Sequence, residues 1–280
     1  MTLILAATPL GNPGDASTRL KSAIESATII AAEDSRRFHR LCADIEVIFT
    51  ARVLSFFEGN EEERSRELLL ELKSGATVLV VSDAGMPTIS DPGFRLMRDA
   101  IAQGIEVSVI PGPSAVTMAV ALSGLPTDRF SFEGFLPRTA GARLATLEKL
   151  RFEERTMVFF EAPHRLVDSL ADCVKVFGEE RQGAICREMT KRYEETIRGT
   201  LSQLAAWSKS NEVLGEITIV IAGAATDSAS LTAADMVARV RDFEAAGMDR
   251  KGAIATVADE FGIAKRLVYA AVVDANKMSQ

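Results

Sequence analysis

The sequence predicts an α/β fold with two sheet-containing domains, followed by a small all-α domain. In the first part of the chain, short apolar runs typical of buried strands alternate with helical patterns, as in a largely parallel sheet. Gly124-Leu125-Pro126-Thr127 then breaks the chain, and a second series of strands and helices follows. After Ser230 only helical patterns remain. We therefore predict domains at residues 1–118, 119–224 and 225–280.

The first domain is predicted from its apolar runs and from the helical patterns between them. Asp15 or Ser17 can cap the first helix. Gly75 and Gly104 each follow a helical pattern directly, at the position where a left-handed residue ends a helix. The predicted strands are residues 3–7, 28–32, 76–81 and 106–110, and the predicted helices are residues 17–27, 61–74, 94–103 and 114–123.

The second domain and the tail follow from the same reasoning. Strands are predicted at residues 129–134, 156–161, 182–187 and 216–222, and helices at 165–177 and 200–208. Residues 223–230 are rich in Ala, Ser and Thr, which is typical of a linker. Helical patterns at 232–246, 250–261 and 264–275, separated by Gly247 and Gly262, predict a helix-turn-helix-like tail. A tail that contacts nucleic acid and a plain three-helix cap are equally favoured.

The composition indicates a soluble globular chain. Of the 280 residues, 47% are apolar and 25% are charged, as in ordinary folded proteins. No apolar run is long enough to cross a bilayer, and the first residues lack the basic start of a signal peptide. We therefore expect a cytoplasmic protein without membrane contact. The net charge of −7 argues against indiscriminate binding to polyanions, but it does not exclude a local basic surface.

Cysteine and histidine usage argues against a metal centre. Cys42, Cys173 and Cys186 are odd in number and lack the spacing of a metal site, so free thiols in a reducing cytoplasm are the simplest interpretation. His39 and His164 are the only histidines in the sequence. We therefore expect no bound metal.

Four polar loops follow predicted strands of the first domain. They comprise residues 8–15, 33–37, 82–93 and 110–115. The third loop is the most informative, because it combines Gly85 and Gly93, which permit unusual backbone conformations, with Pro87 and Pro92, which restrict φ. The carboxyl ends of parallel strands share one edge of the sheet, and ligands bind at that edge. We therefore predict that the four loops enclose a single cleft.

The same loops restrict the chemistry of the ligand. The first loop lacks the G-x-G-x-x-G spacing of a dinucleotide fingerprint, and no Gly-Lys-Ser/Thr follows it to form a Walker A loop. Ser114 opens a helix whose free N–H groups can hold a carboxylate. The cleft offers acids and backbone groups but little positive charge. A partly cationic ligand with a carboxylate and an adenosine therefore fits better than a nucleoside triphosphate.

Several segments of the chain, all in one order, carry a resemblance to a known family. They are A-T-P-L-G-N-P-G-D at 7–15, A-A-E-D-S-R-R at 31–37, V-S-D-A-G-M-P-T-I-S-D-P-G-F at 81–94, P-G-P-S-A at 111–115, S-G-L-P-T-D-R-F at 123–130, F-E-G-F-L-P-R at 132–138, F-F-E-A-P-H-R-L at 159–166, R-E-M-T-K at 187–191 and R-G-T-L at 198–201. On these segments the chain resembles the S-adenosylmethionine-dependent methyltransferases of the tetrapyrrole methylase class. Within that class it is similar to the ribosomal RNA small subunit methyltransferase I family. Ser35, Met86 and Ala162 depart from the family pattern without removing a charge, and the tail after Gly223 matches weakly.

The resemblance implies a tetrapyrrole-methylase-like fold that binds S-adenosylmethionine in a cleft between two α/β domains, without a metal, and it implies a homodimer. It also implies methylation of the ribose 2′-hydroxyl of a cytidine in the decoding region of 16S ribosomal RNA, in the small ribosomal subunit. Transferred position by position, the cofactor-binding residues are Pro9, Asp83, Ala84, Gly85, Ile89, Ser90, Ser114, Ala115, Gly215 and Glu216.

Catalytic and RNA-binding residues are expected around the same cleft. A ribose hydroxyl is a poor nucleophile while it is protonated, so a base, or a cation that lowers its pKa, should help. From Glu33, Asp34, Glu161, Glu188 and Lys191 we favour Glu33 and Asp34 with Lys191 as catalytic residues, although each is equally well interpreted as a structural ion-pair member. The predicted RNA-binding residues are Arg36, Arg37, Arg40, Arg138, His164 and Arg165.

Two alternatives stay open. A tetrapyrrole C-methyltransferase of the precorrin or uroporphyrinogen type would use the same cofactor loops, but the P-H-R and A-A-E-D-S-R-R segments and the basic tail favour RNA. A non-enzymatic nucleic-acid-binding module suits the tail and the basic clusters, but the elaborate cleft argues against it. Aromatic residues make up only 6% of the chain, so extensive base stacking is not expected. Phe38 and Phe135 are candidate exceptions, although core packing is the favoured interpretation of both.

Overall fold

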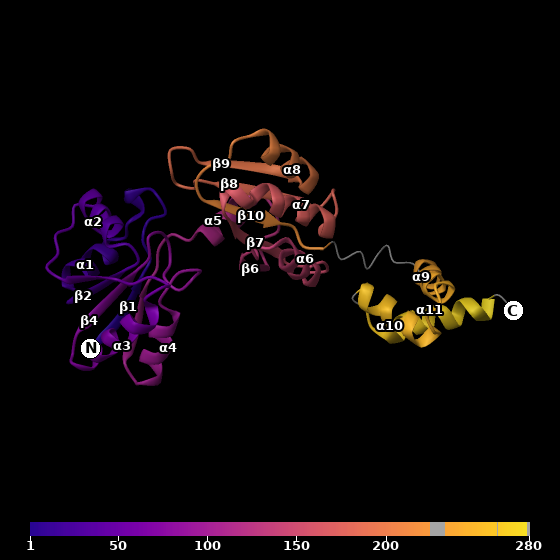
Figure 1. Ribbon diagram of the computed structural model, residues 1–280, viewed down its shortest axis with the longest axis horizontal. Helices are drawn as coiled ribbons and strands as arrows, with labels where there is room; N and C mark the ends of the chain where they lie inside the picture. Colours follow the sequence, from indigo (N-terminus) through magenta and orange to yellow (C-terminus); the bar gives the residue numbers. More distant parts are fainter. Residues whose placement is uncertain (225–232, 262, 279–280) are drawn as a thin grey trace.

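A computed structural model describes residues 1–224, 233–261 and 263–278 of the chain (Figure 1). In these residues two five-stranded sheets follow one another along the sequence, each flanked by helices, and a helical tail follows the second sheet. Of the helices described, none is both long and apolar enough to cross a membrane. The predicted α/β architecture with a helical C-terminal part is confirmed.

The first sheet is entirely parallel, as the alternation of strands and helices predicted. Its strand order is β3-β2-β4-β1-β5. The carboxyl ends of β1, β2, β4 and β5, where the four polar loops begin, therefore lie at one edge. The strands are β1 (Thr2–Ala6), β2 (Ile29–Ala32), β3 (Arg52–Ser55), β4 (Thr77–Val81) and β5 (Glu106–Ile110).

Apolar side chains cover both faces of this sheet. On one face, Leu20 and Ile24 of α1 and Phe38 of α2 pack against the strands. On the other face, Leu68 of α3 and Leu96 of α4 do the same. The sheet is therefore a rigid base for the loops at its edge. The helices are α1 (Thr18–Ser26), α2 (Ser35–Asp44), α3 (Glu61–Lys73) and α4 (Phe94–Ala102).

The second sheet is mixed and has the order β6-β7-β10-β8-β9. Strand β6 pairs with β7 in parallel, and the other pairs are antiparallel. Helices α6, α7 and α8 pack on one face and helix α5 packs on the other. The predicted domain boundary at residue 118 falls within α5, and it stays a prediction. The elements are α5 (Ala115–Ser123), β6 (Phe130–Phe135), α6 (Ala140–Lys149), β7 (Thr156–Glu161), α7 (Leu166–Phe177), β8 (Gln182–Arg187), β9 (Glu195–Thr200), α8 (Leu201–Ser210) and β10 (Ile217–Ile221).

The tail consists of α9 (Ala233–Ala245), α10 (Arg250–Glu260) and α11 (Lys265–Met278), which confirms the helical patterns predicted there. The three helices pack around Val240, Val257 and Val268, which are at most 1% exposed. Gly247 between α9 and α10 has a φ of +92°, as a residue that ends a helix often does. Residues 225–232, which include most of the linker predicted at 223–230, and Gly262 lie outside the described residues.

Some elements were not predicted from the sequence. They are α2, β3, α6 and β9, and the predicted loop at residues 33–37 is wrong in extent, because Ser35 to Arg37 form the first turn of α2. The side chain of Asp34 caps this turn by accepting hydrogen bonds from the backbone N–H groups of Arg36 and Arg37. Strands β3 and β9 lie at sheet edges, where one side has no neighbouring strand. Strand β3 (RVLS) and strand β9 (ETIRGT) are short or largely polar, and neither contains a fully buried residue, so the sequence carries no clear apolar run there.

Candidate functional site

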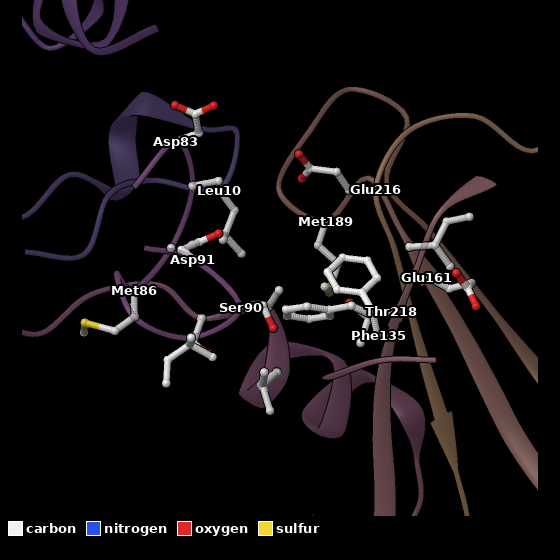
Figure 2. A pocket seen from close by; sticks show the side chains of 18 of the residues that line it. Leu10, Asp83, Met86, Ser90, Asp91, Phe135, Glu161, Met189, Glu216 and Thr218 are labelled. Atoms are coloured by element: carbon white, nitrogen blue, oxygen red, sulfur yellow. The ribbon is translucent and has the colours of Figure 1, made fainter. Parts of the chain in front are cut away.

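A cavity of about 410 Å³ lies between the polar loops of the first sheet and the end of the second sheet (Figure 2). Leu10, Glu33, Asp83 and Ser114, one from each of the four loops, line it. The prediction that these loops enclose a single cleft is confirmed. Figure 2 shows Asp83 and Asp91 on one side and Glu161 and Glu216 on the other, so both sheets contribute to the walls.

Most residues predicted to bind the cofactor line this cavity. Pro9 is buried next to Leu10, which does line it. Contact of any of these residues with a cofactor stays a prediction. The predicted residues in the lining are Asp83, Ala84, Gly85, Ile89, Ser90, Ser114, Ala115, Gly215 and Glu216. Lining residues that were not predicted for any role are Leu10, Met86, Asp91, Val116, Phe160, Ala162, Pro163, Met189, Ile217 and Thr218.

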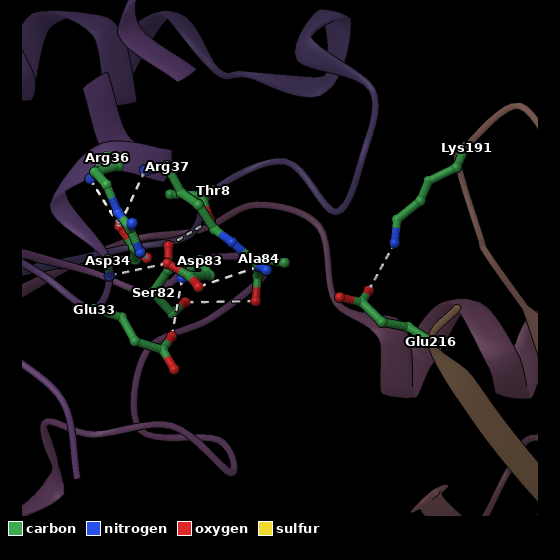
Figure 3. A network of polar contacts seen from close by, with 10 residues as sticks. All are labelled: Thr8, Glu33, Asp34, Arg36, Arg37, Ser82, Asp83, Ala84, Lys191 and Glu216. Atoms are coloured by element: carbon green, nitrogen blue, oxygen red, sulfur yellow. Dashed lines mark hydrogen bonds and ion pairs between the residues drawn. The ribbon is translucent and has the colours of Figure 1, made fainter. Parts of the chain in front are cut away.

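A set of polar contacts joins the loop after β2 to the loop after β4 (Figure 3). The backbone N–H of Asp83 donates to Oε2 of Glu33 at 3.1 Å, and the N–H of Asp34 donates to Oδ1 of Asp83 at 3.0 Å. The guanidinium of Arg37 lies 3.2 Å from Oδ2 of Asp83. These reciprocal bonds fix two of the loops relative to each other before any ligand binds.

The acidic side of the cavity disfavours ionisation of its own carboxyl groups. Burial raises the pKa of Glu33 and of Asp83. Burial, together with the nearby carboxylate of Glu33, raises the pKa of Asp91 to about 7. Asp91 was not singled out from the sequence, although it stands in the S-D-P-G segment of the third loop. Acids whose protons exchange near neutral pH are frequent at functional sites.

The third loop contains an unusual concentration of left-handed residues. Gly85 and Gly93 have φ values of +81° and +123°, which confirms why glycine stands at these positions. Thr88 and Ser90 are also left-handed, at +77° and +64°, although their side chains disfavour this conformation. Strained residues of this kind persist where the surrounding structure holds them, often at functional sites. An antiparallel bridge between Thr8 and Gly85 helps to fix the backbone of this loop.

On the opposite side, Glu188 organises the loop that faces the first domain. Its Oε1 accepts hydrogen bonds from Lys191 Nζ at 2.9 Å and from the backbone N–H of Glu216 at 3.0 Å. Lys191 Nζ also lies 3.1 Å from Oε2 of Glu216 (Figure 3). Burial works to lower the pKa of Lys191, but the two carboxylates outweigh it and raise that pKa. The stem of Lys191 lies against Gly11 of the first loop, where a Cβ would come within 2.3 Å of Lys191 Cγ.

The structure separates the three predicted catalytic residues. Glu33 lines the cavity, whereas Lys191 lies beside it and pairs with Glu188 and Glu216. Asp34 caps α2 and pairs with Arg36 at 3.0 Å, and its bonds to Arg36 lower the pKa of Asp34 to about 2. A carboxylate with so low a pKa is a weak proton acceptor at neutral pH.

The predicted RNA-binding residues differ in accessibility. Arg36 and Arg40 have side chains that are 91% and 85% exposed, and Arg138 and His164 are also exposed. Arg37 is exposed too, but its guanidinium faces Asp83. The Arg165 side chain is only 15% exposed and donates to the backbone carbonyls of residues 136 and 137. Arg165 is thus engaged by the protein itself.

The fold and the cavity define the class to which the chain belongs. The family of Tetrapyrrole (Corrin/Porphyrin) Methylases matches residues 2–205, and the chain belongs to this family. Ribosomal RNA small subunit methyltransferase I of Mycobacterium tuberculosis (strain ATCC 25618 / H37Rv) is 48% identical over 276 residues, covering 98% of this chain and 95% of that protein. The protein of the same name from Halalkalibacterium halodurans is 39% identical and covers 96% of this chain and 93% of its own length. The resemblance predicted from the sequence motifs is confirmed.

A solved structure agrees at the level of the fold. The crystal structure of uroporphyrin-III C-methyl transferase from Thermus thermophilus, complexed with S-adenyl homocysteine, matches with a TM-score of 0.56 and 16% identity, over 79% of this chain and 96% of that chain. Within the described ranges, no group of three or more His, Cys, Asp or Glu side chains is placed to hold a metal ion.

Proposed function

We propose that this chain transfers a methyl group from S-adenosylmethionine to the ribose 2′-hydroxyl of a cytidine in 16S ribosomal RNA of the small ribosomal subunit. The observation that carries the proposal is the 48% identity, over 98% of the chain, to a ribosomal RNA small subunit methyltransferase I. The uroporphyrin-III C-methyl transferase, in contrast, is only 16% identical. The proposal includes a cytoplasmic location and a homodimer.

The residues of the cavity fit this methyl donor. The carboxyl groups of Glu33, Asp83 and Asp91 complement a cationic ligand. Ser114 precedes α5 without capping it through its side chain, so N–H groups of the first turn are available to a carboxylate. Apolar side chains such as Phe160 can cover an adenosine. When bound, the donor supplies a methyl group already activated on sulfur, so alignment with the acceptor carries much of the reaction.

The chain itself must help the acceptor hydroxyl to lose its proton. Glu33 lines the cavity and its raised pKa makes it a better proton acceptor than an ordinary glutamate. Lys191 keeps its charge, because Glu188 and Glu216 raise its pKa, and a cation beside the cavity favours the deprotonated oxygen. Asp34 supports both the α2 cap and the contact to Asp83, so we assign it to the positioning of Glu33's loop.

Exposed basic side chains near the cavity supply the contacts to RNA phosphates in this proposal. Arg36, Arg40, Arg138 and His164 extend into solvent. Phosphate contacts of this kind make RNA binding weaker as salt increases. In this proposal Arg165 positions the chain at Leu136 and Pro137, because its guanidinium donates hydrogen bonds to their backbone carbonyls.

Transfer of labelled methyl groups tests the substrate. Small ribosomal subunits from cells that lack this protein should accept label from S-adenosylmethionine, and a uroporphyrinogen-type substrate should not. Mapping of ribose methylation on the labelled RNA should place the methyl group on one cytidine. Label in the porphyrin alone would replace the proposal by a tetrapyrrole C-methyltransferase.

Single-turnover methylation at saturating cofactor tests the catalytic assignment. Glu33→Gln and Lys191→Met should each lower the rate by orders of magnitude, because the first removes the proton acceptor and the second removes the cation. Lys149→Met is the matched control, since Lys149 is exposed in α6 and is not among the cavity-lining residues. Wild-type rates in both test variants would remove these residues from the mechanism.

A further inference from the structure

Phe135 is an aromatic side chain that is both exposed and part of the cavity wall. It lines the cavity, yet it is 54% exposed. The interpretation of Phe135 as a core residue is therefore wrong, whereas Phe38 is 4% exposed and does belong to the core. An exposed aromatic ring in a cavity wall is a typical contact surface for a ligand.

A β-bulge places Phe135 in the cavity. Phe132 lies opposite Val158 and Phe135 lies opposite Phe160, with a shift in register between Phe132 and Gly134. In a regular strand, residues three positions apart point to opposite faces of the sheet. The one additional residue puts the side chains of Phe132 and Phe135 on the same face. Gly134 has a φ of +69°, which is typical of the glycine in such a bulge.

Hydrogen bonds from Arg165 also fix the chain directly after Phe135. Arg165 donates hydrogen bonds to the backbone carbonyls of Leu136 and Pro137, and it lies 3.3 Å from Oε1 of Glu161, which is buried. Phe135 therefore stands between a bulge and an arginine clamp. A ring held in place in this way loses little conformational freedom when a ligand binds.

One aromatic neighbour supports the ring without covering it. The centroids of Phe135 and Phe160 are 5.6 Å apart and the rings are inclined by 63°. This edge contact leaves a face of Phe135 for another planar group. Figure 2 shows Phe135 on the side of the cavity opposite Asp83 and Asp91, so the ring and these two carboxylates belong to different walls.

We propose that Phe135 is the surface on which the base of the methylated nucleotide stacks. The inference rests on the proposed function and adds a residue that positions the acceptor. The exposed ring faces what enters from solvent, and Arg138, an exposed cation, follows three residues later on the same segment. Any base can stack on an aromatic ring. A base stacked on Phe135 would hold its ribose in the cavity, toward the side of Asp83 and Asp91.

The test compares steady-state methylation of small ribosomal subunits, isolated from cells lacking this protein, by wild type, Phe135→Ala, Phe135→Leu and Phe135→Trp. Stacking is lost in the alanine and leucine variants, so kcat/KM should fall by about 5- to 150-fold, mainly through KM. The tryptophan variant should stay within a few-fold of wild type. Phe152→Ala is the control, because Phe152 is 46% exposed and is not among the cavity-lining residues.

Calorimetry with S-adenosylhomocysteine distinguishes the acceptor base from the adenine of the cofactor. Its Kd should be the same for wild type and Phe135→Ala. An equal loss of S-adenosylhomocysteine binding would overturn the inference by assigning the ring to adenine. Full activity of Phe135→Leu would overturn it too, since an apolar surface would then suffice. If the wild-type protein did not methylate the subunits at all, the proposed function would be wrong, and this inference would be wrong with it.

Discussion

Asp91→Asn should stabilise the protein at pH 8 far more than at pH 4.5. In the folded protein, burial raises the pKa of Asp91 to about 7, whereas the unfolded chain releases this proton near pH 4. Between these two values the folded state binds more protons than the unfolded state, so the unfolding free energy of the wild type falls as the pH rises. Asparagine carries no such proton, and its amide needs no ionisation in the cavity.

The size of the effect follows from the same values. A rise in pKa from about 4 to about 7 corresponds to about 4 kcal/mol if solvent does not screen the charge. Asp91 is only partly buried, so screening reduces the gain at pH 8 to roughly 1–2 kcal/mol. For a chain of this length, that gain raises Tm by about 2–8 °C.

Thermal unfolding of wild type and Asp91→Asn between pH 4.5 and pH 8 measures the difference. The Tm gain should increase up to about pH 7 and stay constant above it. Asp128→Asn, which changes an exposed aspartate, should show no such increase. A Tm difference for Asp91→Asn that is the same at both ends of the range, or a variant less stable at pH 8, would refute the reasoning.

Further predictions concern a cavity glycine and a buried ion pair. Gly215→Ala should lower methyl transfer more than tenfold, because the added Cβ would collide with Oε1 of Glu188 and displace it. Gly178 has a similar φ of +88° but nothing within 4 Å of an added Cβ, so Gly178→Ala should lower the free energy of unfolding in urea by about 1–3 kcal/mol and leave activity unchanged. Equal activities would contradict the role of Glu188. Arg143→Leu should lower the unfolding free energy by about 3 kcal/mol, because it removes a partner of the 4%-exposed Asp172 side chain. The double variant with Asp172→Leu should regain part of that loss, and an additive loss would contradict the ion-pair argument.

The loops could be placed from the sequence because their position follows from topology alone. Strands alternating with helices predict a parallel sheet, and a parallel sheet brings the carboxyl ends of its strands to one edge. The glycines of the third loop could be interpreted for a similar reason, since left-handed φ values at Gly85 and Gly93 follow from local chemistry. Both predictions depend on backbone geometry and not on side-chain surroundings.

The properties that depend on packing could not be predicted. The raised pKa of Asp91 results from burial beside Glu33, which stands 58 positions earlier (91 − 33) in another loop. The capping role of Asp34 requires α2, whose first residues were interpreted as a loop. Gly134 inside a predicted strand was a signal of the bulge, since an isolated glycine in a strand often marks one. Its consequence for Phe135 required the register of β6 against β7.

A crystal structure with S-adenosylhomocysteine tests the central claim most directly. We expect the ligand in the cavity between the two sheets, in contact with residues 83–85 and 114–115 of the third and fourth loops and with residues 215–216 directly before β10. A ligand bound elsewhere on the chain, with this cavity empty, would contradict the account.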